Sequence, residues 1–494
     1  MKKIKLLFAA FVAVLSTFVG GKALAYDITV NNVGSGTYES YQIFTGDLSE
    51  DTLSNIKWGN GISTEGQTAL QTKYEVTSAS KLAEKLATFN TSEAEAFAKE
   101  AAKYLQNPGT LTGLAAGYYL VQNKTVGENE AYTNYILEVV KDVTVTPKTD
   151  VPTVEKKVKD TNDTTGVTSD WQDSADHDIN DKVPFQLTAT LPENYDSYNS
   201  YYLNFSDELS AGLTYNKDAK VYVVNGTERT EVTNYFYAAE NGSSFAIKDL
   251  KQIAVDGAAT VDKNSKIVVE YTATLNENAI IGSKGNPNTV KLIYSNNPNN
   301  SGDGNQTPGT PPTTPPTPPT PPTETGKTPK DTVIVFTYKT VVNKVDQNNK
   351  ALEGAAFALY KIVNGQEKLV KEYQAGSATS FEFTGLDDGD YVLKETKTPA
   401  GYNSIADVKF RVTAEHDILS DNPALTSLSG TAASGELTFT ADETAGSLTT
   451  EVQNKKGSIL PSTGSVGTTL LYLVGAALVV AAGVLLVTKK RMEA

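Results

Sequence analysis

Cysteine is absent from the 494-residue chain, so no disulfide can brace it. Histidine occurs only at His177 and His416, which argues against histidine-based catalysis and against a histidine-held metal. Positive charge is also scarce, since 43 basic residues face 58 acidic ones and leave a formal net charge of −15. Nucleic-acid binding needs clustered positive charge. We therefore expect no nucleic-acid partner, no metal site and no cofactor.

Long apolar runs occur only near the two ends of the chain. A lysine-rich start precedes the first run, and small residues then predict a signal peptidase cut between Ala25 and Tyr26. The second run, 468–487, carries no charge and at ~1.5 Å per residue can cross a bilayer core of ~30 Å. The basic residues 489–491 follow it and belong on the cytoplasmic side. Everything between the two runs is therefore expected outside the cell.

A polar pentapeptide, LPSTG, stands directly before the second apolar run. Its residues are Leu460, Pro461, Ser462, Thr463 and Gly464. Pentapeptide, apolar span and basic end together resemble the cell-wall sorting signal of Gram-positive surface proteins. The resemblance implies that a sortase cuts between Thr463 and Gly464 and passes the Thr463 carboxyl group to an amine. The membrane span would then be a temporary retainer.

The length favours about three domains between the two ends. We place them at 26–147, 148–340 and 341–457, after a signal peptide at 1–25 and before the sorting tail at 458–494. Short segments rich in Val, Ile, Tyr and Thr alternate with polar residues and are bounded by Gly, Asn and Asp. This pattern predicts a mainly β chain of tandem Ig-like sandwiches.

Two segments depart from the β pattern. Residues 80–105 are rich in helix formers, and Ser92 with Glu95 predicts a capping box, so we expect one or two helices inserted in the first domain. The proline-rich segment within 302–329 favours an extended polyproline II spacer over an SH3-type ligand. It is either a hinge between domains two and three or a loop of domain two. The second reading arises because the apolar segment starting at Asp331 is too long for one strand.

Strand alternation directs a lysine, an acid and an asparagine to the buried face in each of two domains. The two sets are Lys156, Asp207 and Asn288 in domain two, and Lys344, Glu395 and Asn454 in domain three. Buried charges are costly unless they are paired or neutralised. Finding the same trio twice therefore calls for a chemical reason, with ordinary ion pairs as the plain alternative.

The chemistry open to such a trio is amide formation between the lysine amine and the asparagine side chain, with release of ammonia. Burial lowers the pKa of a lysine, and an acid kept protonated can polarise the amide carbonyl. The folded core supplies proximity, and no outside enzyme is needed. In domain two, Lys157 is an alternative to Lys156, and Asn286 or Asn296 to Asn288.

At this point the chain resembles the major (backbone) pilins of Gram-positive sortase-assembled pili. The segment YVLKETKTPAGY resembles their E-box, and VTVTPKTD resembles their pilin motif, with Lys148 at the lysine position. The resemblance implies CnaA- and CnaB-type Ig-like domains, with domains one and three CnaB-like and domain two CnaA-like. It further implies internal bonds from Lys156 to Asn288 and from Lys344 to Asn454, promoted by Asp207 and Glu395.

The resemblance also implies how such subunits assemble. Thr463 would be joined to Lys148 of the next subunit, and each internal bond would tie the first strand of its sandwich to the last. The implied partners are identical subunits, pilus-specific and housekeeping sortases, minor pilins and peptidoglycan, with a host ligand possible. The first domain is expected to lack an internal bond, because Asn32 and Asn123 stand where domain three has its lysine and acid.

Other functions and sites stay open at this stage. A monomeric wall-anchored adhesin or a minor pilus subunit would share the sorting signal and the sandwiches. A wall hydrolase is poorly supported, since no nucleophile elbow, Cys–His pair or metal triad is evident. The segment Asp173–Asp181, DSADHDIND, has the clustered oxygens that calcium takes, although an acidic solvated loop is the interpretation we favour.

Overall fold

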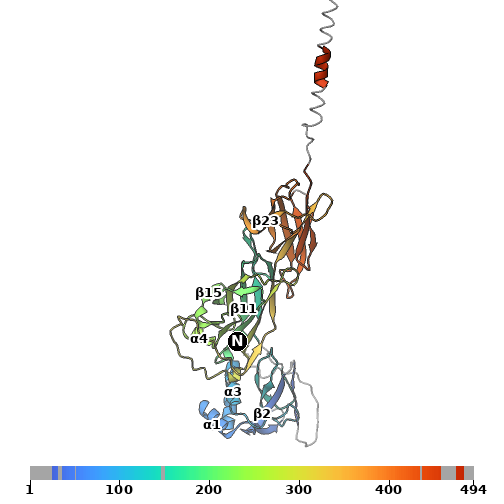
Figure 1. Ribbon diagram of the computed structural model, residues 1–494. Helices are drawn as coiled ribbons and strands as arrows, with labels where there is room; N and C mark the ends of the chain where they lie inside the picture. The colour runs from blue at the N-terminus through green and yellow to red at the C-terminus, as the bar shows by residue number, and fades with distance from the viewer. Residues whose placement is uncertain are drawn as a thin grey trace, which may run out of the picture.

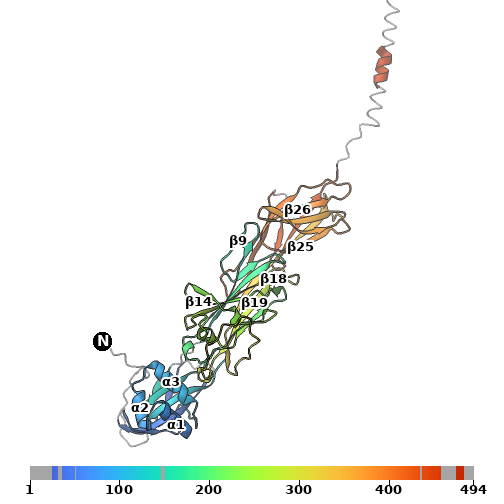
Figure 2. The ribbon, with the colours of Figure 1, turned by 90° about the vertical axis from the view of Figure 1, so that its left-hand side faces the viewer.

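The computed structural model describes residues 25–31, 36–49, 52–145, 151–433, 437–457 and 474–482. Its three strand-rich domains follow one another along an elongated molecule (Figure 1). Domain one lies at one end, domain two in the middle and domain three at the other end. A view turned by 90° shows the same row (Figure 2).

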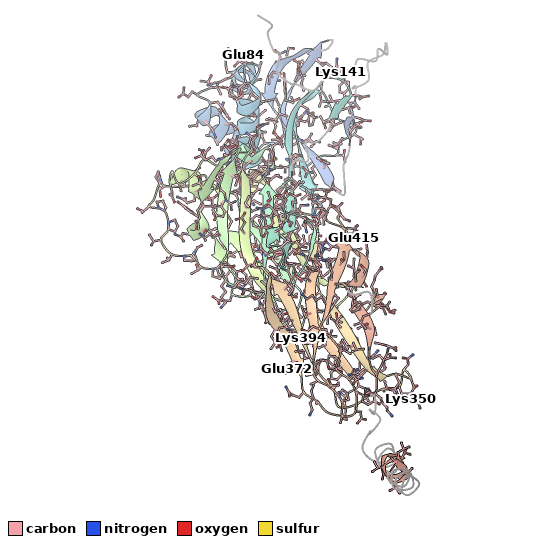
Figure 3. All side chains as sticks on the ribbon, turned by 90° about the horizontal axis from the view of Figure 1, so that it is seen from above. Glu84, Lys141, Lys350, Glu372, Lys394 and Glu415 are labelled. Atoms are coloured by element: carbon pink, nitrogen blue, oxygen red, sulfur yellow. The ribbon has the colours of Figure 1, made fainter. Side chains whose placement is uncertain are left out.

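Domain one joins a small sheet core to a helical layer. Its strands are β1 (Ile28–Val30), β2 (Thr37–Ser49), β3 (Thr52–Trp58), β4 (Gly117–Thr125), β5 (Asn134–Val139) and β6 (Val143–Val145). The order β3-β2-β4-β5 forms an antiparallel sheet, and β1 pairs with β6 in parallel. Side chains such as Glu84 and Lys141 project from this domain in the view from above (Figure 3).

The helical layer of domain one differs in detail from the prediction. Its helices are α1 (Thr64–Lys73), α2 (Ala79–Leu86) and α3 (Thr91–Ala102). The two expected within 80–105 are α2 and α3, whereas α1 was missed. The capping box consists of Asn90 and Glu93, not Ser92 and Glu95, because the Asn90 side chain accepts from the Glu93 backbone N–H and the Glu93 carboxylate accepts from the Asn90 N–H.

Domain two is a sandwich of two sheets around an aromatic-rich core. Its strands are β7 (Val154–Val158), β8 (Thr161–Asn162), β9 (Val167–Thr168), β10 (Ser174–Asp176), β11 (Lys182–Thr190), β12 (Leu203–Leu209), β13 (Leu213–Tyr215), β14 (Lys220–Asn225), β15 (Glu228–Glu231), β16 (Tyr237–Ala238), β17 (Ser244–Ile247), β18 (Lys266–Leu275), β19 (Asn286–Ser295), β20 (Thr325–Lys327) and β21 (Asp331–Phe336). Its helical turns are η1 (Tyr195–Ser197), η2 (Thr233–Tyr235), α4 (Lys251–Val255) and η3 (Pro298–Asn300). One sheet has the order β15-β14-β18-β11-β7 and the other β10-β21-β19-β12-β17-β16.

The proline-rich segment connects two strands of the same sheet. It leaves after β19 and returns to β20 and β21, both of which pair with β19. Its first part is tied to the domain surface, since the Gln306 side-chain amide donates to Asp249 Oδ2 at 2.6 Å and the Gly309 N–H donates to Asp256 Oδ1 at 2.8 Å. The segment therefore lies within domain two, and the chain enters domain three after β21.

Domain three is a second sandwich. Its strands are β22 (Tyr338–Asp346), β23 (Ala356–Val363), β24 (Gln366–Tyr373), β25 (Ser380–Leu386), β26 (Gly389–Lys397), β27 (Val408–His416), β28 (Leu425–Ala432), β29 (Thr440–Asp442) and β30 (Ser447–Asn454). They form the sheets β25-β22-β30-β29 and β24-β23-β26-β27-β28. The first strand of the domain, β22, pairs in parallel with the last, β30.

Residues 474–482 form a short helix in the predicted membrane span at 468–487. The rest of that span lies outside the described residues. Within the part of the chain that the structure covers, no helix is both long and apolar enough to cross a bilayer.

Candidate functional site

The lysine, acid and asparagine of domain two meet in the core between its sheets. Lys156 lies on β7 of one sheet, while Asp207 and Asn288 lie on β12 and β19, which are adjacent strands of the other. Alternation along each strand turns these three side chains inward, and each is at most 3% exposed. The site is therefore shielded from water on every side.

The Lys156 amine contacts both other members of the trio. Its Nζ donates to Asn288 Oδ1 at 2.6 Å and is hydrogen-bonded to Asp207 Oδ1. A fourth side chain, Tyr271 of β18, joins them. The Tyr271 hydroxyl lies 3.2 Å from Lys156 Nζ, donates to Asp207 Oδ2 at 2.5 Å and accepts from Asn288 Nδ2 at 2.7 Å.

Burial makes the neutral form of the Lys156 amine easier to reach than in an exposed lysine. Burial lowers the pKa of Lys156 to about 8, although the neighbouring Asp207 acts in the opposite direction. Roughly a tenth of such amines are neutral at pH 7, against about one in three thousand for an exposed lysine. A neutral amine beside an amide carbonyl is the nucleophile that amide exchange needs.

The alternative residues in domain two lie elsewhere. The Lys157 ammonium forms an ion pair with Asp173 at 2.6 Å. The Asn286 side chain binds backbone groups of Ile280 and Val335 and so holds a loop, and the Asn296 amide donates to the Glu130 carbonyl of domain one.

The trio of domain three is arranged differently. Lys344 lies on β22 and Asn454 ends the adjacent parallel strand β30, so both belong to one sheet, while Glu395 of β26 faces them from the other sheet. Lys344 Nζ is hydrogen-bonded to Asn454 Oδ1 and lies 3.6 Å from Glu395 Oε1. It also donates to the Val452 carbonyl at 2.9 Å, which holds the amine in place.

The acid of domain three contacts the asparagine directly. Asn454 Nδ2 donates to Glu395 Oε2 at 3.1 Å and to the Asn403 carbonyl at 2.8 Å. The Thr398 hydroxyl also donates to Glu395 Oε2, at 2.9 Å. Burial lowers the pKa of Lys344 even though Glu395 opposes the shift. Both trios thus combine an amine with a lowered pKa, a carboxyl group and an amide.

Sequence reasoning missed Tyr271, Thr398 and Asn403. Alternation in β18 does place Tyr271 on the inward face with Val269 and Ala273. That signal identifies a core residue, but not which strand lies across from it. The neighbours of the site therefore depended on strand order.

One prediction about the domain-two strands is wrong. Lys156 is on the first strand, but Asn288 is on β19, and β21 follows in the same sheet. The Lys156–Asn288 contact therefore joins the first strand to a strand that precedes the end of the domain. In domain three the corresponding contact does join the first and last strands.

Several predicted residues lie outside the described part of the chain. These are Lys148, Asn32 and the pentapeptide at 460–464. At the expected signal peptidase site, Ala25 begins the described chain and the Tyr26 N–H donates to the Leu114 carbonyl at 2.8 Å. In domain one, Asn123 is buried and its Oδ1 accepts from the Thr133 N–H and hydroxyl.

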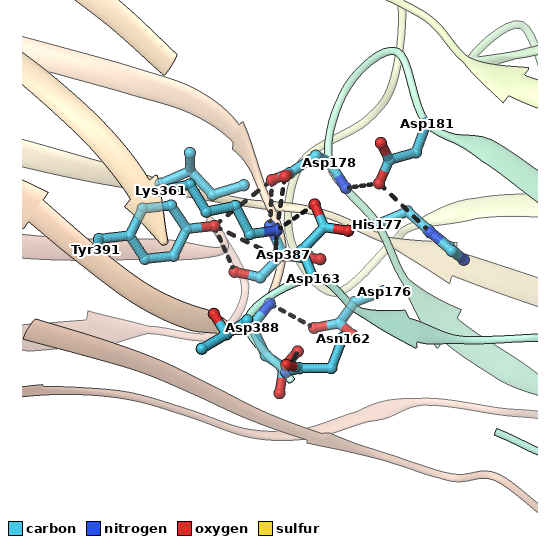
Figure 4. A network of polar contacts seen from close by, with 12 residues as sticks. Asn162, Asp163, Asp176, His177, Asp178, Asp181, Lys361, Asp387, Asp388 and Tyr391 are labelled. Atoms are coloured by element: carbon cyan, nitrogen blue, oxygen red, sulfur yellow. Dashed lines mark hydrogen bonds and ion pairs between the residues drawn. The ribbon is translucent and has the colours of Figure 1, made fainter. Parts of the chain in front are cut away.

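The acidic segment Asp173–Asp181 is not the solvated loop that we expected. It lies at the joint between domains two and three, with Asp173–His177 buried, and Lys361 of β23 inserts there among aspartates of both domains (Figure 4). Lys361 Nζ lies 2.6 Å from Asp178 Oδ2 and 3.2 Å from Asp163 Oδ2, and it is also paired with Asp387. Three carboxylates thus surround one ammonium group.

Comparisons with known families match each part of the chain after domain one. Residues 179–298 match a Gram-positive pilin backbone subunit 2, Cna-B-like domain, where we expected a CnaA-like one. Residues 339–423 match a prealbumin-like fold domain, and residues 452–494 match an LPXTG cell wall anchor motif.

The chain is also similar to individual proteins and solved structures. The trypsin-resistant surface T6 protein of Streptococcus pyogenes serotype M6 is 27% identical over 447 residues, covering 76% of this chain and 75% of its own. The solved T6 backbone pilin of the same serotype covers 89% of this chain and all of its own, with a TM-score of 0.54 and 18% identity. The full-length major pilin SpaD of Corynebacterium diphtheriae gives a TM-score of 0.46 at 18% identity, covering 88% of this chain and 97% of its own.

Fold and anchor together define a modular, Ig-like surface protein, which confirms the predicted fold class. The chain resembles the backbone pilins of Gram-positive bacteria in these family matches and relatives, as its motifs predicted. It is an extracellular protein anchored to the cell wall, and the family that it resembles is structural.

Proposed function

We propose that the chain is the shaft subunit of a covalent pilus, in which a sortase joins Thr463 to Lys148 of the next subunit. Two internal Lys–Asn amide bonds, Lys156–Asn288 and Lys344–Asn454, brace each subunit. The observation that carries this proposal is the recurrence of a buried amine in contact with an amide and a carboxyl group, in two domains with different strand arrangements.

The chemistry follows from the contacts. The neutral lysine amine attacks the side-chain carbonyl carbon of the asparagine, and a new N–C bond forms. The carboxyl group, Asp207 or Glu395, exchanges protons with the reacting groups, and the asparagine nitrogen leaves as ammonia. Exclusion of water prevents hydrolysis from competing. The carboxyl group ends with the proton count it began with, so no cofactor is needed. Each site reacts once, because its lysine and asparagine stay joined.

Each bond would close a long loop. The separations are 288 − 156 = 132 and 454 − 344 = 110 residues. Cross-links closing loops of this size stabilise a fold by about 4–5 kcal/mol on the chain-entropy account. In a protein without cysteine, these bonds take the bracing role that disulfides have elsewhere.

Intact mass spectrometry tests the internal bonds. The denatured chain should be lighter than its sequence mass by two molecules of ammonia. The Lys156→Ala and Lys344→Ala variants should each restore one of them. A wild-type mass equal to the sequence mass would refute both bonds.

Polymerisation is tested separately, in cells that assemble the pilus. Lys148→Ala should abolish the high-mass ladder on an immunoblot and leave the monomer, while Lys141→Ala serves as a nearby lysine control. A ladder that persists in Lys148→Ala would show that another lysine accepts Thr463. Absence of any ladder from wild-type cells would favour a monomeric wall-anchored adhesin.

A further inference from the structure

The hydroxyl of Tyr271 bridges the acid and the amide nitrogen in domain two. It donates to Asp207 Oδ2 at 2.5 Å and accepts from Asn288 Nδ2 at 2.7 Å. It also lies 3.2 Å from Lys156 Nζ, so one oxygen atom touches all three members of the trio. Its position is fixed by aromatic packing, since the ring stacks on Phe185 with centroids 5.4 Å apart.

The two trios differ in how the acid reaches the nitrogen that must leave. In domain three, Asn454 Nδ2 donates directly to Glu395 Oε2. Among the described contacts of domain two, Asp207 makes no hydrogen bond to Asn288, and the group that touches Asn288 Nδ2 is the Tyr271 hydroxyl. A leaving amide nitrogen needs a proton to depart as ammonia, and here the path from the acid to that nitrogen passes through Tyr271.

We propose that Tyr271 is a catalytic residue of domain two, whose hydroxyl relays a proton from Asp207 to the departing nitrogen of Asn288. This inference rests on the proposed Lys156–Asn288 bond and adds a residue to it. Domain three needs no such relay, because the longer side chain of Glu395 reaches the asparagine itself.

The step balances as a proton relay. Lys156 Nζ, as a neutral amine, bonds to Asn288 Cγ and passes one proton to Asp207 Oδ1. Asp207, protonated at the start, gives its Oδ2 proton to the Tyr271 oxygen, while the Tyr271 O–H rotates and gives its own proton to Asn288 Nδ2. The Cγ–Nδ2 bond breaks with its electron pair on nitrogen. Ammonia leaves, and Asp207 and Tyr271 each end with one proton, as they began.

The buried surroundings of Tyr271 keep its hydroxyl able to donate a proton. Tyr271 is 3% exposed, and burial, reinforced by Asp207, raises its pKa well above the ordinary value. The hydroxyl therefore stays protonated and can donate. The members of the trio are each at most 3% exposed, so removing the hydroxyl takes away the proton donor that contacts the departing nitrogen.

The test follows bond formation in the full chain. Cell-free translation is stopped in denaturant at set times, the chain is digested, and the peptide carrying the Lys156–Asn288 link is measured by mass spectrometry. Tyr271→Phe should slow its formation by about 10²-fold, the range typical of lost acid–base assistance. Tyr294→Phe is the matched control, because it removes a buried hydroxyl of the same core that has no hydrogen-bond partner among the described residues. It should react at the wild-type rate.

The Lys344–Asn454 link is the internal control for folding of the chain in every sample, and it should form normally. Formation of the domain-two link at the wild-type rate in Tyr271→Phe would overturn the relay and leave the proposed bond intact. A wild-type chain without this link would instead refute the bond itself, and the relay with it.

A second variant separates proton transfer from packing. Placing 3-fluorotyrosine at position 271 preserves the ring and hydroxyl, so the domain can fold, but makes the phenol more acidic. The relay predicts a changed rate of bond formation. An unchanged rate, with Tyr271→Phe failing to fold, would show that the hydroxyl serves only the structure.

Discussion

In domain two the amine of Lys156 and the carboxyl group of Asp207 are in direct contact, so a proton can pass between them. The structure pairs Lys156 Nζ with Asp207 in a site without water access, and burial lowers the pKa of Lys156 to about 8. The reactive arrangement, neutral amine with protonated acid, contains the same number of protons as the resting ammonium–carboxylate pair. Lowering the pKa of the amine therefore makes the transfer of that proton to Asp207 less costly.

This proton count predicts the pH dependence of bond formation in domain two. The rate should be nearly constant from pH 6.5 to 7.5 and should fall above pH 8, approaching tenfold per pH unit, because the pair then loses its shared proton. The measurement starts from freshly translated chain stopped in denaturant before the link forms, which is then refolded at each pH and analysed for linked peptide over time. The final yield at each pH controls for folding. A rate that rises through pH 8 would show that the amine reacts without a proton from the acid.

At the scale of elements, the two proposed bonds would enclose their domains to different extents. A Lys344–Asn454 bond would join parallel neighbours at the first and last strands, so tension along domain three would bypass the residues between them. A Lys156–Asn288 bond would leave β21 and the proline-rich segment in the path from Asn288 to Phe336. In domain two, tension therefore bears on the ladder between β19 and β21.

The element arrangement predicts one extension step per subunit under force. Shearing β21 from β19 and β10 would release 336 − 288 = 48 residues, which span at most about 160–170 Å when extended. Single-molecule stretching of the linked chain should show this step, and domain three should not extend. Lys156→Ala should replace it with a release of 336 − 156 = 180 residues, about 600 Å, because the whole sandwich then opens. A wild-type chain that never extends would contradict this force path.

At the scale of the whole molecule, the joints decide whether the domains act as one rod. Domain one is tied to domain two through Lys99, which donates to the Ser197 carbonyl at 2.7 Å, and through the Lys327–Glu128 pair at 2.6 Å. Domains two and three are tied by Lys361 and by backbone bonds, including Ile179 N–H to the Gly385 carbonyl at 3.1 Å. At each joint, both domains contribute groups to these contacts.

The joint between domains two and three contains more acidic than basic side chains, and this excess determines how its stability changes with pH. Burial raises the pKa of Asp176, Asp178, Asp387 and Asp388, and acidic neighbours add to the shift at Asp176 and Asp387. At Asp178, Lys361 opposes the shift before Asp181 adds to it, and at Asp388 the Asn162 side chain opposes it before Asp160 adds. Burial opposes charge on His177 as well, but Asp181, Asp160 and the Lys159 carbonyl together raise its pKa.

The raised pKa values of the aspartates and of His177 change the stability of the joint with pH in the same direction. A carboxyl group with a raised pKa costs stability once the pH exceeds its ordinary value, and the cost grows up to the raised value. A histidine with a raised pKa contributes stability below about 6.5 and loses it as pH rises through the raised value. The joint between domains two and three should therefore weaken from pH 5 to pH 8.

Lys361→Met tests this joint directly. Removing the ammonium leaves Asp163, Asp178 and Asp387 without it, and breaking a buried pair of this kind costs about 3–5 kcal/mol. Hydrogen exchange at the Asp387 amide, which donates to Asp178 Oδ1 at 3.0 Å, should speed up more at pH 8 than at pH 5. The surface pair Lys394–Glu367 supplies the control, and Lys394→Met should leave this amide unchanged. Equal effects of the two variants would contradict the role of Lys361.

What the sequence by itself determined was local. Alternation placed Lys156, Asp207 and Asn288 on buried faces, because side-chain direction in a strand depends only on consecutive residues. The two apolar runs and the pentapeptide indicated an extracellular, wall-anchored chain in the same way, since they are contiguous signals.

Only the tertiary structure decided which of these inward residues meet, and which others join them. It brought Tyr271 to the trio, placed β21 beyond Asn288, and put the segment Asp173–Asp181 around Lys361 of another domain. The capping box lies at Asn90 and not at the predicted Ser92, because a helix start depends on how the helix packs as well as on its cap residues. Strand order and domain contacts bring together residues that are not neighbours in the chain, such as Lys361 and Asp178, 183 positions apart, and no local pattern encodes those pairings.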